Sequence, residues 1–148
     1  MERKNHPHKF FTEEERKKIE RTISQAEKIT SGEIRVHVEK ETKKDIFERA
    51  KEVFEKLKMA NTKDRNGVLI YLALENKQFT ILGDKGINNK VPEGFWNDIK
   101  NEMEKYFKEN KFAEGIAYGI EKAGGKLKEF FPYKTSDVNE LSNEISEG

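Results

Sequence analysis

The chain has 148 residues, which fits one ordinary domain and is long enough to bury a substantial core. Lys and Arg number 29 and Asp and Glu 28, and the resulting formal net charge of +1 argues against a dedicated nucleic-acid binder. There is no cysteine, which excludes disulfides, thiolate catalysis and cysteine-ligated zinc.

No apolar run approaches the roughly 20 residues that a membrane helix needs, so we expect no transmembrane segment. The stretch from Met1 to His8 has basic residues but lacks the apolar centre of a secretory signal. We therefore expect a cytoplasmic protein and a monomer. Residues 1–9 are expected to be a flexible N-terminus, residues 10–132 one domain, and the polar residues 133–148 a disordered tail.

The first elements follow from local patterns. Residues 12–15 form a capping box, in which Thr12 and Glu15 bond to each other's backbone, and apolar residues at helical spacing continue the helix to about Ile29. Residues 33–39 alternate between apolar and polar side chains, which predicts a strand with one face more buried than the other. Apolar residues across 45–59 share one stripe and predict a second helix.

Residues 67–75 read as a buried strand, residues 75–77 as a tight reversal, and residues 78–83 as a strand that returns antiparallel. The strand, helix and strand that span residues 33–74 form a βαβ unit, whose two strands should be parallel.

The second half of the chain predicts two more helices. Trp96, Ile99, Met103 and Phe107 share a helical face after Pro92. A further helix follows from Phe112 to Leu127, with Gly124 and Gly125 as an expected weak point or bend. The predicted fold class is a three-layer α/β/α sandwich with a small mixed sheet of about four strands, one of them an extra edge strand.

This topology brings acidic loops together. The starts of the two parallel strands and the end of the third strand lie at one sheet edge, so Glu33, Asp64 and Asp84 should converge with Asn66 and the carbonyls of the turn at residues 83–87. Oxygen ligands from loops suit a hard cation, so calcium or magnesium is the predicted metal. As a loop residue, Asp84 is expected to be exposed.

Two alternatives stay open. The acidic residues can instead serve as caps and ion pairs, for example with Arg35, Arg65 and Lys85. Open α/β sheets also usually bind ligands at the carboxyl ends of their parallel strands. That opposite edge is a rival site, which holds Glu39, Glu41, Glu75 and Asn76.

Catalytic residues are not identified. His37 lies on the polar face of its strand, and without a second histidine or a serine partner we interpret it as a packed or hydrogen-bonded residue. No nucleophile is evident elsewhere. A phosphatase without one would need a metal to activate water, and a lone calcium ion does this poorly.

Four segments lie in order along the chain, at residues 30–36, 64–70, 81–87 and 112–116, and their most specific parts are the Asp-x-Asn-Gly-Val-Leu segment and the Gly-x-x-Gly-Ile turn. Together these segments resemble the TPM domain family, which includes thylakoid-lumen acid phosphatases and photosystem-repair proteins. The resemblance covers roughly residues 10 to 131.

The resemblance implies the fold given above and a metal or phosphatase function. Plant members are described as acid phosphatases, and some members bind calcium or another divalent ion near these loops. Asp64 and Asp84 match the family's acidic loop positions, with Glu33 as a weaker third. Many relatives carry an export signal and a membrane anchor, whereas this sequence shows neither pattern.

From these observations we expect a module that binds calcium or magnesium through Asp64, Asp84, Glu33 and Asn66. In this hypothesis the ion orders a docking surface for an unknown protein partner in a stress or repair assembly. The alternative is a metal-dependent acid phosphatase of low activity on phosphomonoesters.

Overall fold

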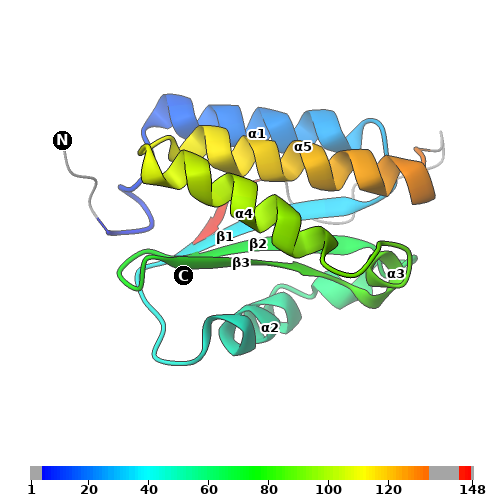
Figure 1. Ribbon diagram of the computed structural model, residues 1–148, viewed down its shortest axis with the longest axis horizontal. Coiled ribbons are helices and arrows are strands. Elements are labelled where there is room, and N and C mark those ends of the chain that lie inside the picture. Colours follow the sequence, from blue (N-terminus) through cyan, green and yellow to red (C-terminus); the bar gives the residue numbers. More distant parts are fainter. Residues whose placement is uncertain (1–4, 134–143, 148) are drawn as a thin grey trace.

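Four strands form a mixed sheet between two layers of helices in the computed structural model, which describes residues 5–133 and 144–147 (Figure 1). Helices α1, α4 and α5 cover one face of the sheet and α2 covers the other, so the predicted α/β/α sandwich is confirmed. The elements in chain order are α1 (Glu13–Glu27), β1 (Glu33–Glu39), α2 (Ile46–Lys56), the 3-10 turn η1 (Met59–Asn61), β2 (Gly67–Ala73), β3 (Gln78–Gly83), α3 (Lys85–Asn88), α4 (Phe95–Lys108), α5 (Phe112–Phe130) and β4 (Ser146–Glu147).

The strands lie in the order β3-β2-β1-β4. β1 and β2 are parallel, with Glu33 opposite Gly67, and α2 lies between them in the chain. β3 returns antiparallel beside β2, with Val68 opposite Gly83. The pairing predicted from the βαβ unit and the hairpin is therefore confirmed. As a result, the starts of β1 and β2 and the end of β3 meet at one edge of the sheet.

Two helices begin at caps that satisfy their first amide groups. At α1, the Thr12 hydroxyl accepts from the Glu15 amide at 3.1 Å and the Glu15 carboxylate accepts from the Thr12 amide at 2.9 Å, so the predicted capping box is present. At α2, Asp45 accepts from the amides of Phe47 and Glu48.

α5 runs unbroken through Gly124 and Gly125, where the sequence predicts a weak point or bend. Gly124 faces α1, where an added Cβ would lie 2.9 Å from the Cβ of Ala26. The glycine therefore permits two helices to pack closely, and packing from the neighbouring helix offsets its low helix propensity.

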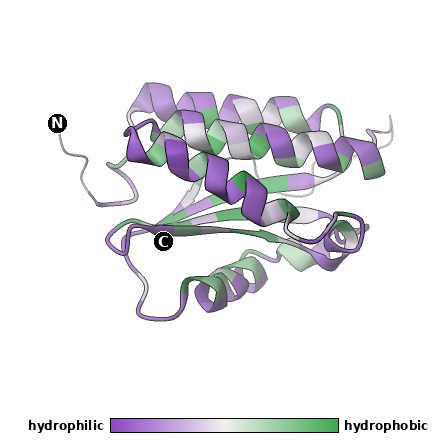
Figure 2. Cartoon of the chain, in the orientation of Figure 1, coloured by the Kyte–Doolittle hydropathy of each residue, from purple (hydrophilic) through white to green (hydrophobic). Residues whose placement is uncertain are grey.

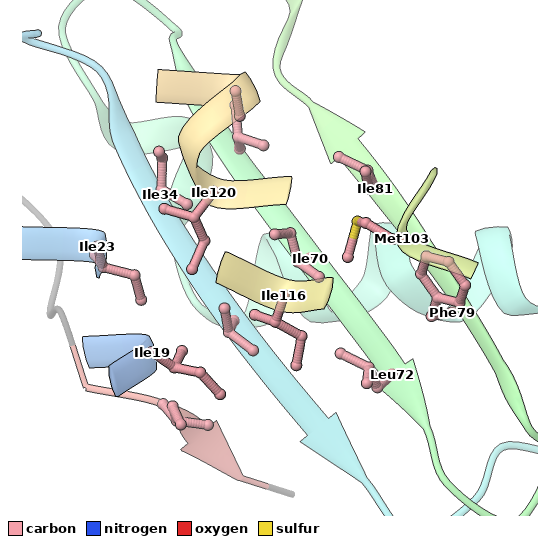
Figure 3. Packing of buried hydrophobic residues seen from close by; sticks show 14 of the residues in the cluster. Ile19, Ile23, Ile34, Ile70, Leu72, Phe79, Ile81, Met103, Ile116 and Ile120 are labelled. Carbon is pink, nitrogen blue, oxygen red and sulfur yellow. The ribbon is translucent and has the colours of Figure 1, made fainter. Parts of the chain in front are cut away.

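The core has two parts, one on each face of the sheet. In the larger part, side chains from α1, α4 and α5 lie on the strands, among them Ile23, Met103 and Ile116 (Figure 3). The smaller part packs α2 on the opposite face of β2. β2 is thus buried on both faces, as its continuous apolar sequence indicates. Polar residues lie on the outer faces of the helices (Figure 2), and no helix in the described part of the chain could span a membrane.

Only residues 133 and 144–147 of the expected disordered tail lie within the described part of the chain. Ser146 and Glu147 form β4, which adds a parallel strand beside His37 and Val38 of β1. Ile145 is buried in the larger core, and its amide donates to the Glu20 carboxylate of α1 at 3.4 Å. A single apolar residue in a polar segment gives no periodic pattern, so this strand was not located from the sequence. Residues 1–4, 134–143 and 148 lie outside the described residues.

Glu147 further holds this strand, since its carboxylate pairs with Arg16 at 2.5 Å and with His8.

Because Ile145 is buried, we expect Ile145→Ala to lower the free energy of unfolding by about 2 kcal/mol, at the low end for a buried Ile truncation. Urea denaturation followed by circular dichroism measures this change. Ile29→Ala is the control, because Ile29 is 43% exposed and should change stability by less than about 0.5 kcal/mol. Equal effects of the two substitutions would contradict the docked strand.

Candidate functional site

The two acidic loops of the predicted site touch each other. The Gly86 amide donates to the Arg65 carbonyl at 2.8 Å, and the Asp84 amide donates to the Gly67 carbonyl at 2.8 Å. An added Cβ on Gly86 would lie 2.1 Å from the Asp64 carbonyl oxygen. The loop before β2 and the loop after β3 therefore lie side by side at one sheet edge, as the topology predicts.

Asp84 is the buried centre of this contact. Its carboxylate accepts from the guanidinium of Arg65 at 2.7 and 2.9 Å, and it also accepts from the Lys85 amide at 2.8 Å as the cap of α3. The side chain is 6% exposed, so the expectation of an exposed carboxylate is wrong. The hydrogen bond to Asp84 raises the pKa of Arg65. Asp84 therefore serves as a helix cap and as the ion-pair partner of Arg65, which is the structural role that the sequence analysis left open.

The other three predicted ligands lie in different environments. Asp64 is exposed to solvent on the loop before β2. Asn66 is buried, and its main-chain carbonyl accepts from the Glu33 amide at 3.4 Å. The Asn66 side-chain nitrogen has no hydrogen-bond partner among the described residues. Glu33 is 3% exposed and lies at the start of β1. The structure thus brings Glu33 and Asn66 together through the backbone.

Glu27 is a residue of this edge that sequence reasoning missed. Its carboxylate accepts from the Ile34 amide at 3.1 Å. Its pKa is raised to about 9, first by burial and next by a hydrogen bond with the Glu33 carboxyl group. A carboxyl group with a pKa near 9 keeps its proton at neutral pH, so Glu27 is uncharged beside Glu33. No sequence signal marks Glu27, because it ends a helix that is rich in charged residues.

The acidic pair fits a hard divalent cation better than Asp84 does. Carboxylate, amide and hydroxyl oxygens are the ligands that Ca²⁺ and Mg²⁺ prefer. One Glu27 oxygen is buried without a hydrogen-bond partner among the described residues. Within residues 5–133 and 144–147, no three His, Cys, Asp or Glu side chains are grouped as metal ligands. A cation here would therefore need other oxygen ligands in addition to the two carboxylates.

The rival edge is built largely from structural contacts. Arg49 donates to both oxygens of Glu39, at 2.9 and 3.1 Å. The Asn76 side chain accepts from the Thr42 amide and donates to the Thr42 carbonyl, each at 2.9 Å, and so ties the loop after β1 to the β2–β3 turn. Glu39 therefore holds α2 on the sheet through Arg49, and Asn76 holds two loops together through Thr42.

His37 is buried and hydrogen-bonded, as predicted, but it does have a serine partner. The Ser146 hydroxyl lies 2.8 Å from Nδ1 of His37, and a Glu39 oxygen lies 3.5 Å from Nε2. The hydroxyl also donates to the Val36 carbonyl at 3.2 Å, so its proton is already engaged. Burial lowers the pKa of His37 to about 4, which makes the ring a weak base. The contacts of His37 with Ser146 and Glu39 therefore hold β4 in place and do not supply an activated nucleophile.

Comparison with known proteins identifies the family and the fold of the chain. The model of the TPM domain matches residues 5–126. The solution structure of the BA42 protein from the psychrophilic bacterium Bizionia argentinensis is 53% identical, with a TM-score of 0.88 over 94% of this chain and 96% of that one. The N-terminal domain of a P. gingivalis protein shares the fold at 17% identity, with a TM-score of 0.66 over 82% of this chain and 78% of that one. A search of curated proteins finds no match. The chain belongs to the TPM domain family.

Proposed function

We propose that this TPM domain is a divalent-cation-binding interaction module, in which the ion binds at the edge shared by the starts of β1 and β2. The bound ion would order the loops at residues 64–67 and 83–88 as a docking surface for a protein partner. Glu27 and Glu33 would supply the negative charge, while Asn66 and Asp64 would contribute from the neighbouring loop.

The observation that supports this proposal is the pairing of the half-buried Glu27 with the buried Glu33. Two carboxyl groups at one point cannot both ionise cheaply, so they retain a proton. A divalent cation can replace that proton and satisfy both groups at once. Asp84 is held by Arg65 and therefore would join such a site only if Arg65 moved.

The same geometry favours a module over an efficient hydrolase. Hydrolysis of a phosphomonoester by a metal site needs an activated water or a nucleophile beside the phosphoryl group. Among the described residues, no three His, Cys, Asp or Glu side chains are grouped as ligands of a catalytic metal ion. A lone hard cation with few carboxylate ligands binds oxygen atoms but lowers the pKa of water little.

Titration of the ¹⁵N-labelled protein with CaCl₂ or MgCl₂ tests the proposal. We expect the first amide shifts in the loops at residues 64–67 and 83–88 and near Glu27 and Glu33. Glu33→Gln should weaken binding at least about 10-fold, because it removes a charged ligand. Affinity should rise between pH 6.5 and 8.5, because the cation competes with the proton of Glu27.

Glu41→Gln is the matched control, since Glu41 is exposed and follows β1 at the opposite edge. The largest shifts at Glu39 and Glu75 would contradict the proposed location. Hydrolysis of p-nitrophenyl phosphate in calcium, magnesium or chelator distinguishes the enzyme class. If chelator and Asp64→Ala each abolish this activity, the protein is a low-activity acid phosphatase and the proposal of an interaction module is wrong.

A further inference from the structure

A cavity of about 1250 Å³ opens at the sheet edge opposite to the Glu27–Glu33 pair. It lies between the β2–β3 hairpin, the segment before α1, and the turn from α4 to α5, all of which gather at one end of the molecule (Figure 1). This is the carboxyl end of the parallel strands, where open α/β sheets usually bind ligands. The acidic and amide groups predicted at this edge do not line the cavity.

The floor of the cavity is apolar and preformed. Phenylalanine rings from three separate segments contact one another there: Phe79 and Phe107 at 4.7 Å between ring centroids, Phe107 and Phe112 at 5.4 Å, and Phe10 and Phe112 at 5.0 Å. Leu74 from the end of β2 also lines it. A floor of linked rings is rigid and offers no polar partner, so it suits the apolar body of a ligand.

The rim of the cavity is cationic. Among the described residues, Lys9, Lys77 and Lys108 line it, against one acidic residue, Glu104. The three lysine side chains are exposed, and none of them forms an ion pair with the residues that the structure describes. The whole chain has a formal net charge of only +1, so three lysines to one glutamate at one opening is a local excess. Such a rim attracts an anionic group.

We propose that this cavity binds a small amphipathic organic anion, with a single carboxylate at the lysine rim and an unbranched apolar chain on the phenylalanine floor. The ligand is a dispersed molecule, since the apolar surface is recessed between the hairpin and the helices. Because the cavity and the Glu27–Glu33 pair lie at opposite ends of β2, this site is independent of the proposed cation site.

Titration of the ¹⁵N-labelled full chain with decanoate, below the concentration at which it forms micelles, tests the proposal. We expect saturable amide shifts at residues 72–79 and 107–112. Decan-1-ol should bind more weakly, because it lacks the negative charge that the rim attracts. Decyltrimethylammonium should bind more weakly still, because the lysines of the rim repel its positive charge. The double variant Lys77→Glu/Lys108→Glu should weaken decanoate binding about 3- to 30-fold and leave decan-1-ol binding unchanged.

Lys90→Glu is the control, since Lys90 is exposed and follows α3 at the other end of the sheet. It should leave decanoate binding unchanged. Equal binding of the cationic and anionic probes, or shifts that map outside the cavity, would overturn the proposal. Binding to phosphatidylglycerol vesicles without binding to dispersed decanoate would also overturn it, because it would identify a membrane surface as the ligand. The ligand series keeps the test decisive if the double variant does not fold.

Discussion

Replacing Glu27 by glutamine is expected to make the protein more stable above pH 8 and to remove most of the fall in stability between pH 7 and 9. In the folded protein the pKa of Glu27 is raised to about 9, chiefly by burial and then by the hydrogen bond with Glu33. The unfolded chain loses that proton near the ordinary value of 4.5. The folded state therefore holds more protons between these values, and its stability falls as pH rises through that window.

Glutamine avoids this loss because it cannot ionise. Its amide oxygen can still accept from the Ile34 amide, and its NH₂ group can donate to Glu33 as the protonated acid does. At pH 8.5 we expect the free energy of unfolding of the variant to exceed that of the parent protein by about 2–4 kcal/mol. This is less than the full pKa shift would give, because Glu27 is only partly buried and solvent screens its charge. Urea denaturation at pH 7.0, 8.0 and 9.0 in the presence of chelator measures the difference.

Glu121→Gln is a suitable control for this comparison, because Glu121 is exposed on α5. Its stability profile should run parallel to that of the parent protein. The pH range also matters, because His37 has a lowered pKa of about 4 and makes stability rise with pH between about 4 and 6.5. Measurements above pH 7 isolate Glu27. Parallel profiles for Glu27→Gln and the parent protein would show that the pKa of Glu27 is not raised in the folded protein.

Gly86→Ala is expected to destabilise the protein by about 2–4 kcal/mol. The added methyl group would lie 2.1 Å from the Asp64 carbonyl oxygen and 2.5 Å from the Arg65 carbonyl oxygen, and both are backbone atoms that cannot turn away. Either the loop before β2 or α3 must shift, which breaks the hydrogen bond from the Gly86 amide to Arg65. The size follows from overpacking combined with loss of a buried hydrogen bond.

Gly125→Ala is the matched control. Gly125 lies within α5, and an added Cβ would meet no atom within 4 Å. There, alanine should stabilise the helix by about 0.5–1 kcal/mol, because it restricts the unfolded chain. Chemical denaturation gives both values, and amide shifts should locate the Gly86→Ala disturbance at Arg65 and Asp84. A neutral Gly86→Ala would mean that the two loops are not packed as described.

The helices and strands could be predicted from the sequence because local patterns encode them. The capping box at Thr12 uses residues three positions apart, and the alternation in β1 reflects the two faces of a strand. The apolar run in β2, followed by a short polar reversal, is enough to predict the hairpin. These patterns depend on residues within one turn or a few positions, so no tertiary information is needed. From the pairing of the strands it follows that the Asp64 and Asp84 loops share an edge.

The chemistry at that edge depended on the tertiary structure. Whether Asp84 faces a cation or Arg65 depends on side-chain conformation and burial, which no spacing along the chain specifies. The raised pKa of Glu27 requires the end of α1 to lie on the start of β1, where the Ile34 amide donates to Glu27, and the packing of the helices on the sheet sets that position. The contact between His37 and Ser146 joins residues 109 positions apart. Sequence periodicity determined which residues face inward, whereas only the packed fold decided which polar groups they meet there.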